Sequence, residues 1–196
     1  MVERPFHHGN LRSELLDHAE TVLAEGGVEA LSLRDLARRS GVSHGAPRSH
    51  FVDRQALLDA LAVRGFERLA ALVRAAAAEG GTFEGRVRRV ARAYLDFAVQ
   101  QPALMELMFA AKGEARSVAV GDAAGRLFAT FDEVLEADRP DVASDAAARQ
   151  RFGLLFATVV QGAASLVGSG RISPGTAAEL VEDGTGILVA ALLGPS

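Results

Sequence analysis

The stretch from Leu31 to Phe51 reads as two short helices joined by a tight glycine turn. Ser32 is placed to cap the first helix, and Asp35 follows at the spacing of a capping box. Gly41 ends this helix and is the turn residue that adopts a positive φ without strain. Ser43 is then placed to cap a second helix. This is the layout of a helix-turn-helix, a motif whose second helix lies in the major groove of DNA.

The outward residues of the second helix are the ones that would reach bases or phosphates. The predicted DNA-contacting set includes these residues and a few from the flanking segments. It consists of Ser32, Arg34, Ser43, His44, Ala46, Pro47, Arg48, Ser49, His50 and Arg54. Pro47 lacks a backbone N–H and by itself predicts a break in this helix. Taken by spacing alone, the motif also fits two surface helices of any α-helical protein.

The composition predicts an all-α chain able to bury a core. Its 196 residues are 49% hydrophobic and 23% charged, with one Tyr and no Trp, and they favour helix over strand. The absence of cysteine from the sequence excludes thiol catalysis, thiolate metal sites and disulfides, and fits a reducing compartment. The N-terminal residues lack the apolar core of an export signal, so we expect a cytoplasmic protein.

The charge balance predicts that any attraction to DNA is local. The net charge is −4, and residues 1–54 hold seven Arg against eight Asp and Glu, which argues against a general polyanion binder. Affinity for DNA would then come from a few placed arginines and helix N-termini, assisted by dimerisation. It should weaken steeply with salt.

Caps, glycines and apolar periodicity predict about nine helices. The expected helices span about 10–25, 32–40, 43–51, 53–79, 83–101, a short helix opened by Pro102, 115–137, 145–169 and 173–193. The charged segment from Glu136 to Asp145 is predicted to be a loop. We expect a three-helix DNA-binding domain at residues 1–52 and a helical bundle at residues 53–196, with the helix at 53–79 bridging them.

Residues 152–170 contain no charge and reach the length of a membrane span. Their polar and glycine content favours a helix buried in a bundle or a dimer interface, so no membrane partner is predicted. Gly184 and Gly186 repeat the small-residue pattern in the last helix. The helices at 145–169 and 173–193 are therefore predicted to form a homodimer interface, with packing inside one chain as the alternative.

Three segments of the first half form a recognisable set: His7 to Arg12, Leu31 to Arg34, and Gly41 to Pro47 leading into Ser49 to Phe51. On these segments the chain resembles the TetR family of bacterial transcriptional regulators, and the resemblance extends over its whole length. The segments look like those of the subgroup whose C-terminal domain carries a Trp…His-Gly motif. Tyr94 to Ala98, Gln101 to Met105, Leu107 to Phe109 and Val160 to Gly162 are similar to that subgroup's ligand domain. The subgroup tolerates a proline in the reading helix, which implies a shortened entry at Pro47.

Three residues depart from the pattern of that subgroup. Arg48 stands where a phosphate-contacting Tyr is usual, and a phosphate contact from it stays possible. Arg54 replaces the usual Lys and, since it keeps the charge, is predicted to clamp a backbone phosphate. Gln161 replaces the motif His and Ala157 the expected Trp, which weakens any ligand role inherited from the motif.

The resemblance implies a homodimeric regulator, most simply a repressor, that leaves a near-palindromic operator when an unidentified small molecule binds the C-terminal bundle. Candidate ligand-contacting residues are Phe66, Leu69, Tyr94, Phe97, Met105, Met108, Phe109, Phe128, Phe131, Phe156 and Gln161. Among these, Tyr94 and Gln161 are able to orient a ligand by hydrogen bonding, and the others also fit plain core positions.

Enzymatic activity is not predicted, because the sequence lacks a nucleophile elbow, a phosphate-cradling glycine loop and a paired histidine-carboxylate motif. No cofactor or metal is expected, since the adjacent His7 and His8 point apart and have no third ligand at helical spacing. The alternative function is a dimeric helical protein that binds a small molecule and has lost DNA binding.

Overall fold

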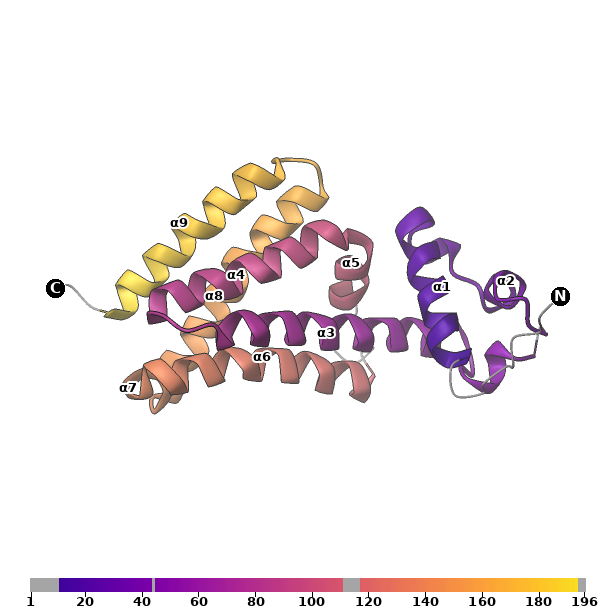
Figure 1. Cartoon of the computed structure of the whole chain (residues 1–196), viewed down its shortest axis with the longest axis horizontal. Coiled ribbons are helices and arrows are strands. Elements are labelled where there is room, and N and C mark those ends of the chain that lie inside the picture. The colour runs from indigo at the N-terminus through magenta and orange to yellow at the C-terminus, as the bar shows by residue number, and fades with distance from the viewer. Residues whose placement is uncertain (1–10, 44, 111–116, 194–196) are drawn as a thin grey trace. The chain divides into compact units, whose positions relative to one another are not determined.

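The computed structural model describes residues 11–43, 45–110 and 117–193. Within these ranges the chain forms nine α-helices, two short 3-10 helices and no strand (Figure 1). The elements are α1 (Leu11–Gly26), η1 (Val28–Ala30), α2 (Leu33–Arg39), η2 (Pro47–Ser49), α3 (Arg54–Ala78), α4 (Phe83–Gln100), α5 (Pro102–Ala110), α6 (Val118–Asp138), α7 (Pro140–Ala143), α8 (Ala146–Gly168) and α9 (Pro174–Leu193). This confirms the all-α prediction.

The helix starts follow the capping residues of the sequence. Ser32 Oγ accepts the Asp35 N–H at 3.5 Å at the start of α2, and Asp53 Oδ1 accepts the Ala56 N–H at 2.8 Å in the first turn of α3. Asp145 caps α8 in the same way, by accepting the N–H groups of the first turn. These side-chain acceptors satisfy backbone donors that a helix N-terminus leaves unpaired.

Two predicted elements are wrong. The second helix of the predicted motif is wrong, because among the described residues 45–53 the chain forms the 3-10 turn η2, with Pro47 in its first position, in place of an α-helix. The segment from Glu136 to Asp145 is not simply a loop, since α6 runs on to Asp138 and Pro140 opens the one-turn helix α7. Proline suits the first position of a helix, where its missing N–H has no intrahelical partner to lose.

The described residues divide into two compact units. The first unit holds residues up to Gly65 together with 103–121, and the second holds residues 66–102 and 122 onward. This division differs from the predicted boundary between residues 52 and 53, and the helix α3 contributes residues to both units. The predicted domain boundary therefore stays a prediction.

The first unit packs α1, η1, α2, η2 and the start of α3 around a small apolar core. Its fully buried side chains include Leu15, Ala19, Leu23, Leu31, Leu36, Ala37, Phe51, Leu57 and Leu61. The helix α5 approaches the middle of α3 closely, because a Cβ added at Gly65 would lie 2.6 Å from the Met108 sulfur. Arg64 on α3 forms an ion pair with Asp17 on α1, so polar contacts also hold α1 in place.

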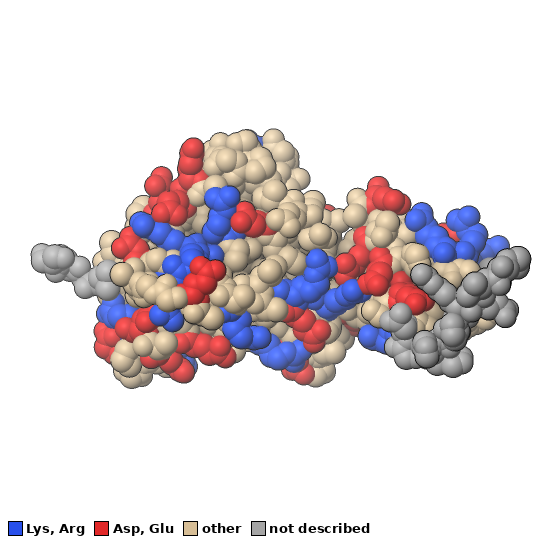
Figure 2. Space-filling view, in the orientation of Figure 1, with Lys and Arg blue, Asp and Glu red and all other residues tan. Residues whose placement is uncertain are grey.

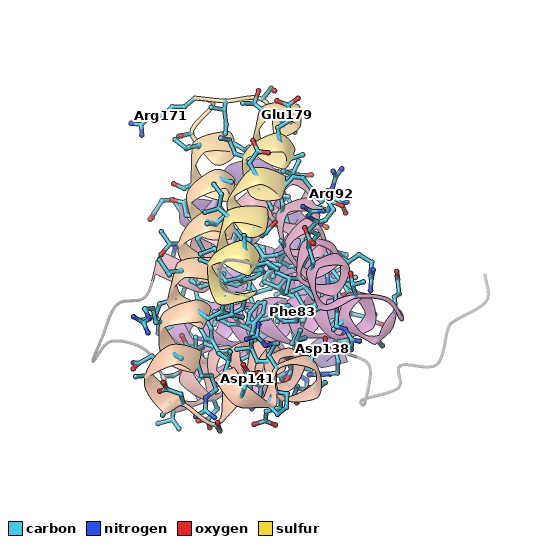
Figure 3. The ribbon with its side chains drawn as sticks, turned by 90° about the vertical axis from the view of Figure 1, so that its left-hand side faces the viewer. Phe83, Arg92, Asp138, Asp141, Arg171 and Glu179 are labelled. Carbon is cyan, nitrogen blue, oxygen red and sulfur yellow. The ribbon has the colours of Figure 1, made fainter. Side chains whose placement is uncertain are left out.

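The second unit is a helical bundle in which α4, α8 and α9 lie side by side (Figure 1). In Figure 3, Arg171 and Glu179 mark the end where a turn joins α8 to α9, and Asp138 and Asp141 lie at the other end. At that second end, Arg139 donates to the Leu192 carbonyl near the end of α9 at 3.2 Å. Its hydrogen bonds also lower the pKa of Asp141 to about 2.

Candidate nucleic-acid interface and ligand site

The described residues between α2 and α3, 40–43 and 45–53, form tight turns rather than a regular helix. The first turn is at Gly41, which has a φ of 66°, a conformation that glycine adopts without strain. The Arg48 N–H then donates to the Gly45 carbonyl at 3.1 Å, and the His50 N–H donates to the Pro47 carbonyl at 3.1 Å. These bonds, each joining residues three apart, hold residues 45–50 in a compact turn, here called the reading turn.

Apolar contacts anchor the reading turn to the first unit. Pro47 is buried, and the following Phe51 is 2% exposed. The guanidinium of Arg12 on α1 lies over the Phe51 ring, 5.3 Å from its centroid, at a distance that allows a cation–π interaction. Because Pro47 is buried, it shapes the turn, and its side chain is not exposed for the DNA contact that the sequence predicts.

Most exposed side chains of this region are polar or basic, whereas the apolar Val52 is also exposed. Arg34, Ser43, Arg48 and Ser49 are exposed, and Ala46, Ser32 and His50 are half-buried. Neither Arg34 nor Arg48 forms an ion pair with another described residue. His44, which was also predicted to contact DNA, lies outside the described residues, as do His7 and His8.

Arg54 is placed differently from the other predicted cations. Its Nε donates to the Leu31 carbonyl at 3.0 Å, and its Nη2 donates to the Val28 carbonyl at 2.6 Å. The carboxylate of Glu29 lies 3.9 Å from the same Nη2. The guanidinium is therefore already bonded to the backbone that leads into α2.

Sequence reasoning missed two basic residues of the same unit. Arg38 and Arg39, in the last turn of α2, have side chains that are 74% and 42% exposed. Their ion-pair partners within the described part of the chain are the exposed carboxylates of Asp35 and Glu25, at 3.4 and 3.5 Å. Figure 2 shows basic side chains gathered over α2, beside acidic ones over α1. The consecutive arginines at the end of a predicted helix were the signal for this patch.

A row of aromatic side chains runs through the second unit. The rings of Phe131 and Phe156 are 4.9 Å apart, and Phe128 continues the row from Phe131 at 6.4 Å. Phe152 and Phe83 extend it at the other end. Phe66, Leu69 and Phe97 are also buried in this unit. Most of the predicted ligand-contacting residues of this unit are thus core residues, whereas Phe128 is 40% exposed.

The structure brings together the two polar residues that were predicted to orient a ligand. Tyr94 on α4 is 2% exposed, and burial raises the pKa of its hydroxyl well above the ordinary value, while the neighbouring Gln161 side chain on α8 lowers it in part. The hydroxyl makes no hydrogen bond of regular geometry. The Gln161 contact is therefore a weak one, and the hydroxyl retains the capacity to bond a further partner.

Three predicted ligand-contacting residues belong to the first unit instead. Met105 and Met108 on α5 are buried there, and Phe109 is half-buried. Met108 packs against Gly65 on α3. Of these three residues, Met108 is therefore part of the packing between α5 and the middle of α3.

An apolar surface extends along α8 and α9. Leu154, Leu155, Leu180 and Ile187 are 61%, 46%, 46% and 70% exposed. Among the described helices, α8 alone is long and apolar enough to cross a membrane by length and composition, and only 22% of its most apolar window is buried. Within one chain, α9 packs closely on α8, because a Cβ added at Gly184 would lie 2.8 Å from Val159.

Residues 11–43, 45–110 and 117–193 contain no group of three His, Cys, Asp or Glu side chains that would hold a metal ion. Two candidate sites remain among these residues. One is the exposed reading turn with the basic patch on α2, and the other is the Tyr94–Gln161 pair.

Two family descriptions match the chain, one for each half. Residues 15–61 match the family described as bacterial regulatory proteins, tetR family. Residues 87–188 match the family described as tetracyclin repressor-like, C-terminal domain. Both descriptions are of regulators, which confirms the prediction that the chain is not an enzyme.

Individual proteins agree with these matches. A solved structure of a protein with unknown function from Rhodococcus sp. RHA1 is 36% identical, with a TM-score of 0.81, over 95% of this chain and 97% of that one. The TetR family transcriptional regulator PfmR from Thermus thermophilus shares the fold, with 17% identity and a TM-score of 0.64, over 89% of this chain and 96% of that one. The HTH-type transcriptional repressor KstR2 of Rhodococcus jostii (strain RHA1) is 40% identical over 55 residues, which are 28% of this chain and 26% of that repressor.

Proposed function

The chain belongs to the TetR family of bacterial regulatory proteins, and we propose that it is a homodimeric, DNA-binding transcriptional repressor of the cytoplasm that a small molecule releases from its operator. The observation that carries the proposal is the first unit, in which a capped helix, a glycine of positive φ and an exposed turn present two arginines that form no ion pair with another described residue. This arrangement suits a surface that meets the DNA backbone and groove edges.

Arg34 and Arg48 are the proposed phosphate-binding cations of the reading unit. Both are exposed and unpaired among the described residues, so binding a phosphate would not require them to leave a carboxylate. Ser43, Ser49, His50, Ser32 and Ala46 are the proposed neighbours at the DNA surface, together with His44. Because the unit has few basic residues, dimerisation on a near-palindromic operator is needed to reach useful affinity.

The proposed dimer forms through α8 and α9. Their exposed leucines and Ile187 provide an apolar face, and such a face on a protein surface favours a partner that covers it. Leu180 and Ile187 are seven residues apart and so lie on one side of α9. A second copy of the chain covers this face most simply, since an isologous contact pairs the same helices from both protomers.

The proposed effector binds in the second unit beside Tyr94 and Gln161. The aromatic row of the same unit favours an apolar molecule, and the buried Tyr94 hydroxyl favours one that carries a hydrogen-bond acceptor such as a carbonyl oxygen. Binding would shift the dimer toward an arrangement whose reading units no longer match the operator, with a coupling of about 1–3 kcal/mol.

We also propose that the chain belongs to the subgroup with a Trp…His-Gly motif. Val160, Gln161 and Gly162 occupy the place of that motif on α8, and Gln161 lies beside Tyr94. An amide in place of an imidazole changes the donors and acceptors offered to a ligand. The effector of this protein is therefore expected to differ from those that the motif histidine recognises.

Fluorescence anisotropy tests the proposed function. The full-length protein is titrated into a labelled duplex of the intergenic DNA upstream of its own gene, with a shuffled duplex of equal length for comparison. We expect selective binding that weakens with salt. The salt slope should fall by about 0.9 for each phosphate that the Arg34→Ala or Arg48→Ala variant no longer binds.

Arg171→Ala is the matched control, because Arg171 is an exposed arginine at the turn between α8 and α9. It should bind DNA as the unchanged protein does. Equal binding to both duplexes, or none to either, at low and physiological salt would contradict a self-regulating repressor. Binding of a small molecule without DNA binding would favour the alternative, a ligand-binding protein that does not bind DNA.

A further inference from the structure

The guanidinium of Arg54 joins the start of α3 to the backbone that precedes α2. Its two bonds, to the carbonyls of Leu31 and Val28, span 23 and 26 residues of the chain. The Val28 carbonyl also accepts the Leu31 N–H at 3.1 Å, which closes η1. Leu31 in turn directly precedes Ser32, the cap of α2. One side chain therefore fixes the entrance of α2 relative to the entrance of α3; we call this set of bonds the Arg54 bridge.

The reading turn lies between the two helices that the Arg54 bridge joins. It is connected to α2 through Gly41 and to α3 through Asp53, which caps the first turn of α3. An exposed turn of this kind takes its direction from the two elements at its ends. A fixed distance between the starts of α2 and α3 therefore limits how far the turn can move.

The chemistry of the bridge favours carbonyl oxygens over a phosphate. Hydrogen bonds from a charged donor are stronger than neutral ones, and the planar guanidinium presents its donors in a fixed fork that spans both carbonyls. The Glu29 carboxylate, 3.9 Å from Nη2, would also repel an approaching anion. By contrast, the guanidinium of Arg48 has no such partners among the described residues.

We propose that Arg54 is a positioning residue, which orders the reading turn for DNA rather than binding a DNA phosphate. The proposal rests on the proposed function, since it takes the reading turn as the surface that meets DNA. It replaces the phosphate clamp that the sequence predicts for this residue. A lysine at position 54 would keep the charge but, as a point charge on a flexible stem, would not hold both carbonyls in one geometry.

Hydrogen–deuterium exchange of the free, full-length protein tests the bridge without DNA. In Arg54→Lys and Arg54→Ala, the amides of residues 28–36 and 45–51 are expected to exchange about tenfold faster, because local opening no longer breaks two charged hydrogen bonds. Arg48→Ala and Glu29→Gln should leave this exchange unchanged. Thermal unfolding of each variant checks that the fold is retained. If Arg54→Ala does not fold, the exchange of the conservative variant Arg54→Lys alone tests the proposal.

DNA binding by the same variants then separates positioning from phosphate binding. With the labelled upstream duplex, Arg54→Lys is expected to bind about tenfold more weakly at an unchanged salt slope, whereas Arg48→Ala lowers the slope by about 0.9 for each phosphate that it no longer binds. A phosphate clamp predicts the opposite pattern. Arg54→Lys would then bind as the unchanged protein does, Arg54→Ala would lower the slope, and amide exchange would not change.

The two measurements fail separately. If the unchanged protein binds no duplex, the proposed function fails, and the exchange experiment alone decides whether Arg54 holds the reading turn. If DNA binding is selective but exchange in Arg54→Lys matches that of the unchanged protein, the positioning role is overturned and the repressor proposal stands.

Discussion

The hydroxyl of Tyr94 is a buried polar atom without a hydrogen bond of regular geometry. Burying a hydroxyl without a full partner costs about 1–3 kcal/mol. We therefore expect Tyr94→Phe to keep or slightly raise the stability of the protein without effector, by up to about 1 kcal/mol. An apparent Tm rise of up to about 4 °C in thermal unfolding would record the gain for a chain of this size.

Gln161 provides the control for this prediction, because its side chain is the one that contacts Tyr94. In a double-mutant cycle of Tyr94→Phe and Gln161→Ala, we expect a coupling energy below about 0.5 kcal/mol. A fall in Tm for Tyr94→Phe, together with a larger coupling, would mean that Gln161 already satisfies the hydroxyl. The hydroxyl would then not be available for an effector.

At the residue scale, the sequence draws attention to side chains that differ in chemistry from their neighbours. Tyr94 and Gln161 stand out as polar groups on apolar helices, and they are neighbours in the structure, while their contact with a ligand stays a prediction. The hydrogen bonds of Arg54 were not predictable in this way, because its partners are the backbone carbonyls of Val28 and Leu31. Every residue has a carbonyl, so no sequence pattern marks which ones a distant arginine will reach.

The contact between α8 and α9 depends on a glycine. A Cβ added at Gly184 would lie 2.8 Å from Val159 Cγ1 and 3.3 Å from Cγ2, and a β-branched side chain on a helix has little freedom to rotate away. Gly184→Ala should therefore destabilise the protein by about 1 kcal/mol, since overpacking of about 1–3 kcal/mol exceeds the gain in helix propensity of about 1 kcal/mol. Chemical denaturation measures the change.

Gly125→Ala on α6 is the matched control, because a Cβ there meets no atom within 4 Å. It should stabilise the protein by up to about 1 kcal/mol through helix propensity alone. Combining Gly184→Ala with Val159→Ala should relieve the overpacking. The double variant should then recover the stability that the overpacking in Gly184→Ala removes. Equal stabilisation by both glycine substitutions would show that α9 does not pack against α8 at this point.

Element boundaries were predictable wherever a capping residue or glycine sets a helix end. The predicted starts at Asp53 and Asp145 match the first turns of α3 and α8 within one residue. The predicted reading helix is wrong because Pro47 lacks the N–H that an α-helix needs there, and the N–H groups of residues 48–50 bond to carbonyls three residues back. The helix α7 was missed because a single turn is too short to show periodicity.

The whole molecule is proposed to work as a dimer, and the apolar face of α8 and α9 makes this testable. Ile187 is 70% exposed and Leu154 is 61% exposed, so an aspartate at either position should leave the packing within one protomer intact. In a dimer interface the same aspartate would bury an unpaired charge, which is strongly unfavourable. We expect Ile187→Asp and Leu154→Asp to be folded monomers in sedimentation experiments at concentrations where the unchanged protein is a dimer.

Leu72→Asp is the control that ties this prediction to one surface, because Leu72 is also apolar and exposed, at 48%, but lies on α3. It should remain dimeric. A repressor that reads two half-sites depends on linked binding, so the monomeric variants should lose about 100-fold or more in affinity for the upstream duplex although every DNA-contacting residue is intact. If Leu72→Asp dissociates while Ile187→Asp stays dimeric, the two protomers meet through another face. If the monomers bind DNA undiminished, the reading units act singly, and effector release through a change in dimer geometry has no basis.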